Sequence, residues 1–140
     1  MEIEFDEIEN AFLFVSMGPM YDNQAILCRE TGKIFYESEL GDSDELPDDI
    51  DDPEKYIAIP HKHELDLGKY LVFQFVSEFI PEKTERVEEI FSKKGAYSRF
   101  KDLLEHIGLL DKWYEYENKA QSEALKEWCS ANNIEIRNGR

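Results

Sequence analysis

The chain contains one group of side chains that could hold a metal ion: His61, His63 and Glu64, followed by Asp66. In an extended backbone alternate side chains point the same way, so the imidazoles of His61 and His63 would face one ligand. Two imidazoles and a carboxylate are a ligand set that zinc accepts. No second cluster accompanies them, and the alternative is that all four are solvent-facing residues in the link after Pro60. We therefore expect no metal and no cofactor, and these residues stay the candidates for a metal-dependent enzyme.

Four basic residues are candidates for an anion site: Arg29, Lys33, Arg99 and Lys101. A fold that brought all four together would form a cationic island on an acidic protein. Guanidinium and ammonium groups bind phosphate or carboxylate through charge-assisted hydrogen bonds. The alternative is that these residues form exposed ion pairs with nearby acids, which stabilise a protein little.

An acidic segment is the most distinctive stretch, since residues 37–54 hold ten acidic residues and no basic one. With so few apolar side chains, the part from about 38 to 54 cannot offset the entropy of ordering, so we predict a solvated, mobile loop. Its spacing does not fit an EF-hand, because Pro47 stands where glycine is required and Pro53 where the bidentate glutamate belongs. A basic protein partner would contact the carboxylates in the middle of the loop, which are Asp48, Asp49, Asp51 and Asp52.

The sequence contains no arrangement typical of catalysis. We find no phosphate-binding loop, no dinucleotide glycine fingerprint and no nucleophile elbow. Cys28 and Cys129 lie among apolar residues, which indicates inert buried thiols rather than nucleophiles. The absence of a catalytic constellation favours a non-enzymatic protein.

The net charge is −16, from 32 acidic and 16 basic residues. A surface of this sign repels nucleic-acid phosphates and anionic lipids, so we expect no membrane binding and little affinity for nucleic acid. The simplest use of such charge is solubility. No run approaches the roughly 18 apolar residues of a membrane span, and the acidic N-terminus does not resemble a secretory signal. We expect a cytoplasmic protein with a single domain over residues 1–140.

The strands that would position these residues are short. Two β-rich runs predict a hairpin over about 24–37, with a turn that ends in Gly32. A further strand is predicted over about 56–59, and the alternation of Ile134, Glu135 and Ile136 predicts a last strand over 134–136. These strands form a small, mostly antiparallel sheet.

Apolar residues recur at helical spacing in five segments: residues 7–15, 65–80, 81–94, 97–107 and about 111–131. Over 5–15 a strand remains the alternative. Gly108 follows the fourth helix, where a left-handed residue without a side chain is favoured, and Asp111 is expected to cap the fifth. About five helices packed on a small sheet make an α+β fold.

Five stretches of the chain stand out together: Arg29–Gly32 with its flanking strands, Tyr56–Pro60, Gly95–Asp102, Gly108–Tyr114 and Glu127-Trp128. Together they resemble a bacterial family of uncharacterised proteins, the one numbered 0158. The resemblance runs from about Phe5 to Ile136 and is most specific in the C-terminal half. It implies a bacterial, cytoplasmic, single-domain protein, and it implies no activity.

Three hypotheses for function therefore stay open. The leading one is a non-enzymatic binding or regulatory module whose acidic loop meets a basic partner. The second is a metal-dependent enzyme that uses His61, His63 and Glu64. The third is a nucleic-acid-related protein, either through phosphate contacts of Arg99 and Lys101 or through mimicry of nucleic acid by the acidic surface.

Overall fold

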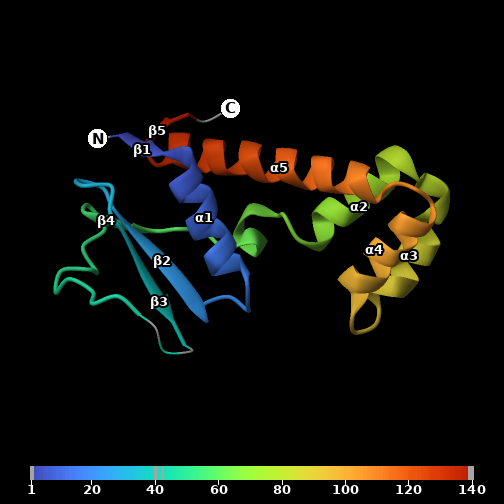
Figure 1. Ribbon diagram of the computed structural model, residues 1–140, viewed down its shortest axis with the longest axis horizontal. Coiled ribbons are helices and arrows are strands. Elements are labelled where there is room, and N and C mark those ends of the chain that lie inside the picture. The colour runs from blue at the N-terminus through green and yellow to red at the C-terminus, as the bar shows by residue number, and fades with distance from the viewer. Residues whose placement is uncertain (1, 40, 42, 139–140) are drawn as a thin grey trace. The chain divides into compact units, whose positions relative to one another are not determined.

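The computed structural model describes residues 2–39, 41 and 43–138 (Figure 1). They form two compact units: unit 1 contains the described residues of 1–65 and 122–140, and unit 2 contains residues 66–121. Strands lie in unit 1 and helices in both, so the predicted α+β class is confirmed. The prediction of a single domain stays a prediction. Within the described ranges, none of the helices is long and apolar enough to cross a membrane.

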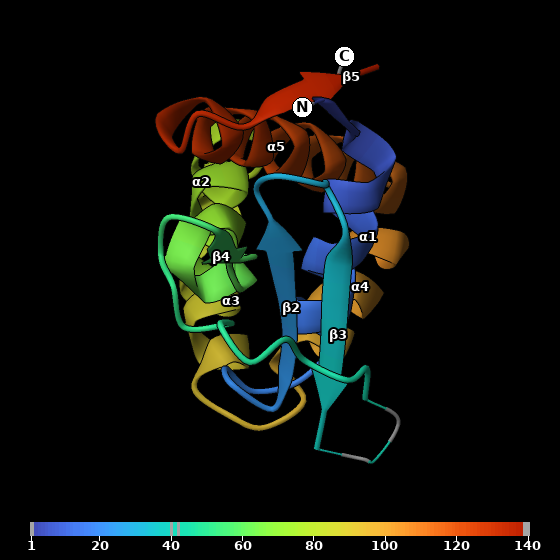
Figure 2. The same cartoon turned by 90° about the vertical axis from the view of Figure 1, so that its left-hand side faces the viewer.

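Unit 1 is built on a three-stranded antiparallel sheet with the order β3-β2-β4, and Figure 2 shows β2 and β3 side by side. The strands are β2 (Asn23–Cys28), β3 (Ile34–Ser38) and β4 (Tyr56–Ala58). Ala25 pairs with Tyr36 across the hairpin, and Leu27 pairs with Ile57 on the other side. The hairpin and the third strand are confirmed to within about one residue.

Helix α1 (Phe5–Ser16) packs against this sheet. Its buried residues Ile8, Ala11, Phe12 and Val15 repeat at i, i+3, i+4 and i+7, which is one face of an α-helix. Burial of each large apolar side chain contributes about 1.5–3 kcal/mol. The helical periodicity therefore decides the structure of this segment against the strand preference of its β-branched and aromatic residues. The strand alternative over 5–15 is wrong.

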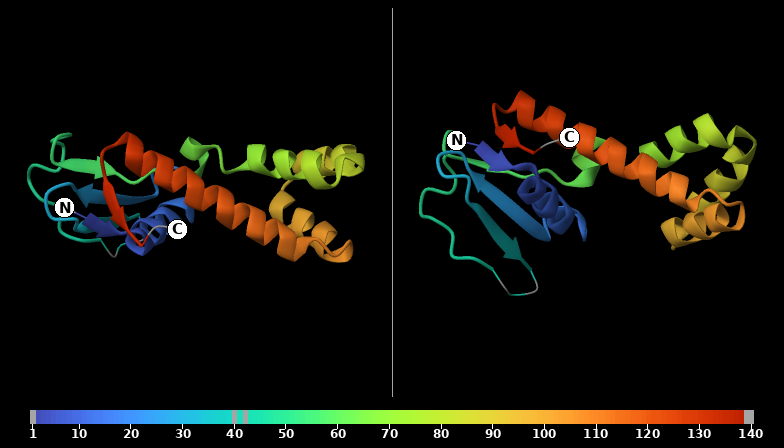
Figure 3. Two further views of the ribbon diagram at one scale, coloured as in Figure 1. Left: turned by 90° about the horizontal axis from the view of Figure 1, so that it is seen from above. Right: turned by 45° about the horizontal axis from the view of Figure 1, so that its top comes forward.

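The chain ends form a second, two-stranded sheet in which β1 (Glu2–Glu4) and β5 (Glu135–Arg137) run parallel. Figure 3 shows the two strands beside each other. Arg137 forms an ion pair with Glu4, with Nε 2.7 Å from Oε1. The predicted last strand exists, but it pairs with β1, which the sequence analysis did not predict.

Unit 2 consists of helices joined by short turns. They are α2 (Lys69–Phe79), the 3-10 turn η2 (Pro81–Lys83), α3 (Thr84–Phe91), α4 (Ala96–His106) and the first part of α5 (Leu110–Ala131). The prediction of one helix over 65–80 is wrong at its start. Lys62–Leu65 form a 3-10 turn, η1, and the left-handed φ of 56° at Asp66 then interrupts the helical backbone before Lys69.

The core of unit 2 is aromatic. Trp113 is 1% exposed, and the rings of Phe75 and Phe100 lie edge-on to it at 5.3 and 5.2 Å. Gly108 takes the predicted left-handed conformation with φ 77°. The predicted cap at Asp111 is wrong, because α5 begins one residue earlier, at Leu110; Asp111 instead places its charge in the first turn, where the helix dipole favours it.

Candidate functional site

His61 is a buried structural histidine, with 2% of its surface exposed. Its Nδ1 accepts a hydrogen bond from the backbone N–H of His63 at 3.1 Å, so Nε2 carries the ring proton and donates to the carbonyl of Gly18 at 2.8 Å. Next to it, the backbone N–H of Lys62 donates to Ser16 Oγ at 3.1 Å. Nε2 of His61 therefore joins this link to Gly18, just after α1, while Nδ1 is used within the link, so neither nitrogen is left for a metal.

His63 stacks on His61 with ring centroids 4.9 Å apart. Burial first, and then the neighbouring His61 and Lys62, lower the pKa of His63. Glu64 turns back, and its Oε1 accepts a long hydrogen bond of 3.4 Å from the backbone of His61. Among the residues that the structure describes, no three His, Cys, Asp or Glu side chains are placed to hold a metal ion.

The four cationic candidates fall in different units, Arg29 and Lys33 in unit 1 and Arg99 and Lys101 in unit 2. Arg29 is half-buried, and its Nη1 donates to the carbonyl of Asn132 at 2.8 Å. It also lines a hollow of about 130 Å³, but Glu135 lines the same hollow and opposes an anion there. The Nζ of Lys101 lies 5.6 Å from the ring centroid of Tyr114. A role in anion binding stays a prediction for all four.

The acidic segment is organised by its own carboxylates. Asp49 accepts from Lys55 Nζ at 3.1 Å through one oxygen and from the hydroxyl of Tyr56 at 3.0 Å through the other. Hydrogen bonding to Lys55 first, and then to Tyr56, lowers the pKa of Asp49. Asp52 Oδ1 accepts from the backbone of Glu54 at 3.0 Å. Two of the four predicted partner contacts, Asp49 and Asp52, therefore shape the turn.

The beginning of the segment covers the free edge of the sheet. Asp44 and Tyr36 exchange two hydrogen bonds of 2.8 Å, one through the Asp44 carboxylate and one through its backbone. The hydroxyl of Ser43 accepts from the backbone of Ser38 at 3.1 Å. An edge strand with free backbone groups invites pairing with another chain, and these bonds occupy that edge of β3. Residues 40 and 42 lie outside the described residues.

Other carboxylates of the segment are exposed to solvent, among them Glu45, Asp48 and Asp51. Lys33, Phe35 and residues 44–48 line an open hollow of about 500 Å³ beside them. The Nζ of Lys33 lies 4.8 Å from the ring centroid of Phe35. Of the four predicted partner contacts, Asp48 and Asp51 are the two exposed residues whose side chains receive no described hydrogen bond, and partner binding by any of the four stays a prediction.

The two cysteines are buried thiols. Burial raises the pKa of Cys129 to about 11, as expected for an inert thiol. At Cys28 burial acts in the same direction, but hydrogen bonds with Thr31 and with the backbone of Glu30 together outweigh it and lower the pKa.

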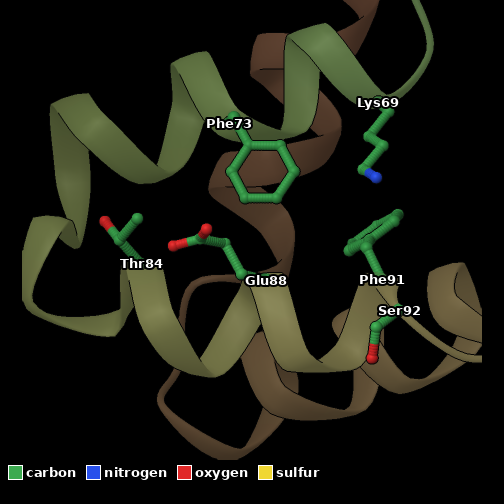
Figure 4. A pocket seen from close by; sticks show the side chains of 6 residues that line it. All are labelled: Lys69, Phe73, Thr84, Glu88, Phe91 and Ser92. Carbon is green, nitrogen blue, oxygen red and sulfur yellow. The ribbon is translucent and has the colours of Figure 1, made fainter.

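A groove between α2 and α3 in unit 2 was not predicted. The groove is a hollow of about 510 Å³, and Figure 4 shows the side chains that line it: Lys69, Phe73, Thr84, Glu88, Phe91 and Ser92. The missed signal is the i, i+4 spacing of Lys69 with Phe73 and of Thr84 with Glu88, which places polar and aromatic groups on one stripe of each helix.

The fold and these sites define a small α+β protein in two compact units, one of which carries most of the net negative charge. The sequence model of the uncharacterised protein family UPF0158 matches residues 11–138, and the chain belongs to this family. The resemblance of its motifs to that family is thereby confirmed. Comparisons with curated proteins and with solved structures found no match.

Proposed function

We propose that this protein is a cytoplasmic, non-enzymatic binding module whose acidic segment, residues 37–54, binds a basic polypeptide partner. One observation carries the proposal: the net negative charge is concentrated in unit 1. Unit 1 holds 21 acidic and seven basic residues, a net of −14, whereas unit 2 holds 11 and nine, a net of −2. The acidic segment alone contributes ten of the 14 net charges of unit 1.

The localisation of charge distinguishes binding from solubility. Charge spread over the whole surface is sufficient to keep molecules apart in solution. A concentrated patch does more, because it attracts an oppositely charged partner over about one Debye length and speeds the encounter. The turn bonds of Asp49 and Asp52 support this role, since they leave Asp48 and Asp51 exposed on the same short turn.

The test uses a fluorescent peptide of ten alternating lysine and arginine residues and follows its anisotropy as protein is added. Asp48→Asn with Asp51→Asn removes two exposed charges and leaves the turn bonds of Asp49 and Asp52 intact. The matched control is Asp102→Asn with Glu105→Gln, which removes two exposed charges from α4 in unit 2. The loop variant should weaken binding about threefold or more at low salt, and the difference should shrink at high salt.

An equal loss in both variants would contradict the proposal, because binding would then follow total charge rather than the acidic segment. So would unchanged binding in the loop variant at low salt. Far-ultraviolet circular dichroism of both variants checks that the folds are intact.

A further inference from the structure

The groove of unit 2 is formed by matching stripes on two helices. Lys69 and Phe73 are four residues apart on α2, while Thr84, Glu88 and Ser92 follow at intervals of four along α3 and its C-cap. In Figure 4, Lys69, Phe91 and Ser92 gather at one end of the groove, and Thr84 with the carboxylate of Glu88 lies at the other. The two charged groups therefore come from different helices, Lys69 from α2 and Glu88 from α3.

The floor of the groove is aromatic and well supported. The rings of Phe73 and Phe91 meet edge to face, with centroids 5.9 Å apart. Phe91 is in turn held by Tyr97 at 5.1 Å and by the fully buried Phe100 at 5.8 Å. Interlocked rings of this kind resist collapse into the groove, so its apolar floor remains available to a ligand.

The polar groups of the groove are hydrogen-bond acceptors at the Thr84 end and a cation, Lys69, at the other end. The hydroxyl of Thr84 donates its hydrogen to the carbonyl of Pro81 at 2.7 Å, and that of Ser92 donates to the carbonyl of Glu89 at 2.6 Å. At the Thr84 end the hydroxyl therefore offers only lone pairs to the groove, as the carboxylate of Glu88 does. The Thr84 end is consequently suited to a cation that donates hydrogen bonds, and the ammonium of Lys69 supplies the matching site for an anion.

Lys69 and Glu88 do not neutralise each other: among the described residues neither belongs to an ion pair. From these contacts we propose that the groove binds a basic amino-acid residue with a free carboxylate, the chemistry of arginine or lysine. Its guanidinium or ammonium meets Glu88 and Thr84, its aliphatic stem crosses Phe73 and Phe91, and its carboxylate meets Lys69. Burying the stem on the rings adds apolar contact that a simple salt ion lacks.

The ligand chemistry has two sources, the free amino acid and the C-terminal residue of a peptide. The volume of the groove lies within the range of small-molecule sites, and a ligand of this size in an open groove should bind with a dissociation constant in about the millimolar range. This site is in unit 2 and is independent of the acidic segment of unit 1.

The test follows backbone amide shifts of α2 and α3 by nuclear magnetic resonance during titration with L-arginine, agmatine and L-citrulline. Agmatine lacks the carboxylate of arginine, and citrulline lacks its cationic side chain. Lys69→Gln should weaken arginine about threefold or more and leave agmatine unchanged, whereas Glu88→Gln should weaken both. Glu89→Gln and Lys119→Gln are the matched controls, since both residues are exposed and neither lines the groove.

Titration with Gly-Gly-Arg as free acid and as C-terminal amide separates the two sources. Tighter binding of the free acid than of arginine identifies a peptide C-terminus, and tighter binding of arginine identifies the free amino acid. The proposal is overturned if arginine shifts no groove amide at about 50 mM. It is also overturned if citrulline binds as well as arginine, or if Lys69→Gln weakens agmatine as much as arginine.

Discussion

The indole of Trp113 contains an unusual feature whose cost can be measured. Trp113 is 1% exposed, yet its Nε1–H has no hydrogen-bond partner among the described residues. A buried donor without a partner loses its bonds to water and gains nothing in exchange. Replacing Trp113 by Phe removes that N–H and retains an aromatic ring against Phe75 and Phe100.

The expected magnitude follows from two opposing effects. Trp113→Phe removes about three buried non-hydrogen atoms, which costs about 2–3 kcal/mol in lost burial. It also removes the unpaired N–H, which raises the free energy of unfolding by about 1–3 kcal/mol. The variant should therefore lose no more than about 2 kcal/mol, whereas Trp113→Ala should lose about 3–5 kcal/mol.

Urea unfolding followed by circular dichroism measures both variants and Trp113→Leu. Leu removes the same N–H but also the edge-to-face contacts, each worth about 0.5–1.5 kcal/mol, so it should lie between Phe and Ala. A loss above about 3 kcal/mol for Trp113→Phe, with an unchanged urea dependence, would refute the reasoning. It would mean that the indole N–H has a partner in the folded protein.

Two further predictions concern domain organisation and pH. Trp128→Phe leaves Trp113 as the fluorescent probe of unit 2, and Trp113→Phe leaves Trp128 as the probe of unit 1. If the chain is one domain, each variant should show the same urea transition by fluorescence as by circular dichroism. Burial, followed by the hydrogen bond with Glu78, raises the pKa of Tyr116 from 10.0 to about 12. The folded state therefore holds the phenol proton more tightly, so this stabilising contribution is complete below about pH 10 and is lost as pH rises to about 12. Tyr116→Phe should lose less stability than wild type between pH 9 and 11, and an identical pH dependence in urea titrations would contradict the assignment.

Periodicity predicted most elements because the buried positions repeat strictly. On α1 the buried positions follow one helical face from Ile8 to Val15, and β2 alternates around Ala25 and Leu27. The glycine at 108 was predictable as well, since its φ of 77° is one that other residues adopt only under strain. These features depend on residues close together in the sequence, where pattern and backbone preference agree.

Features that depend on distant residues were not predictable. The strand β1 exists through pairing of Ile3 with Ile136, from the opposite end of the chain, and three residues carry too little pattern to show it. The start of α2 was misplaced because apolar spacing continues through Leu67, while Asp66 takes a left-handed φ that its sequence context does not reveal.

The candidate sites show the same division. The metal hypothesis relied on the residue types of His61 and His63, but the carbonyl of Gly18, 43 residues before His61, uses the proton-bearing nitrogen of its ring. Asp49 and Asp48 are chemically identical in the sequence. Only the positions of Lys55 and Tyr56 in the folded turn separate the carboxylate that shapes the turn from its exposed neighbour.

The carboxylates of the acidic segment both form the hydrogen bonds of its turn and give it its charge. The carboxylates of the segment are close together in the sequence and repel one another. The hydrogen bonds that Asp44, Asp49 and Asp52 accept offset part of that repulsion. The exposed Asp48 and Asp51 receive no such relief within the described part of the chain. A cation that binds there lowers the energy of the folded turn more than that of the unfolded chain, where the carboxylates are farther apart. Binding of a basic partner should thus stabilise unit 1, in proportion to the logarithm of partner concentration above its dissociation constant.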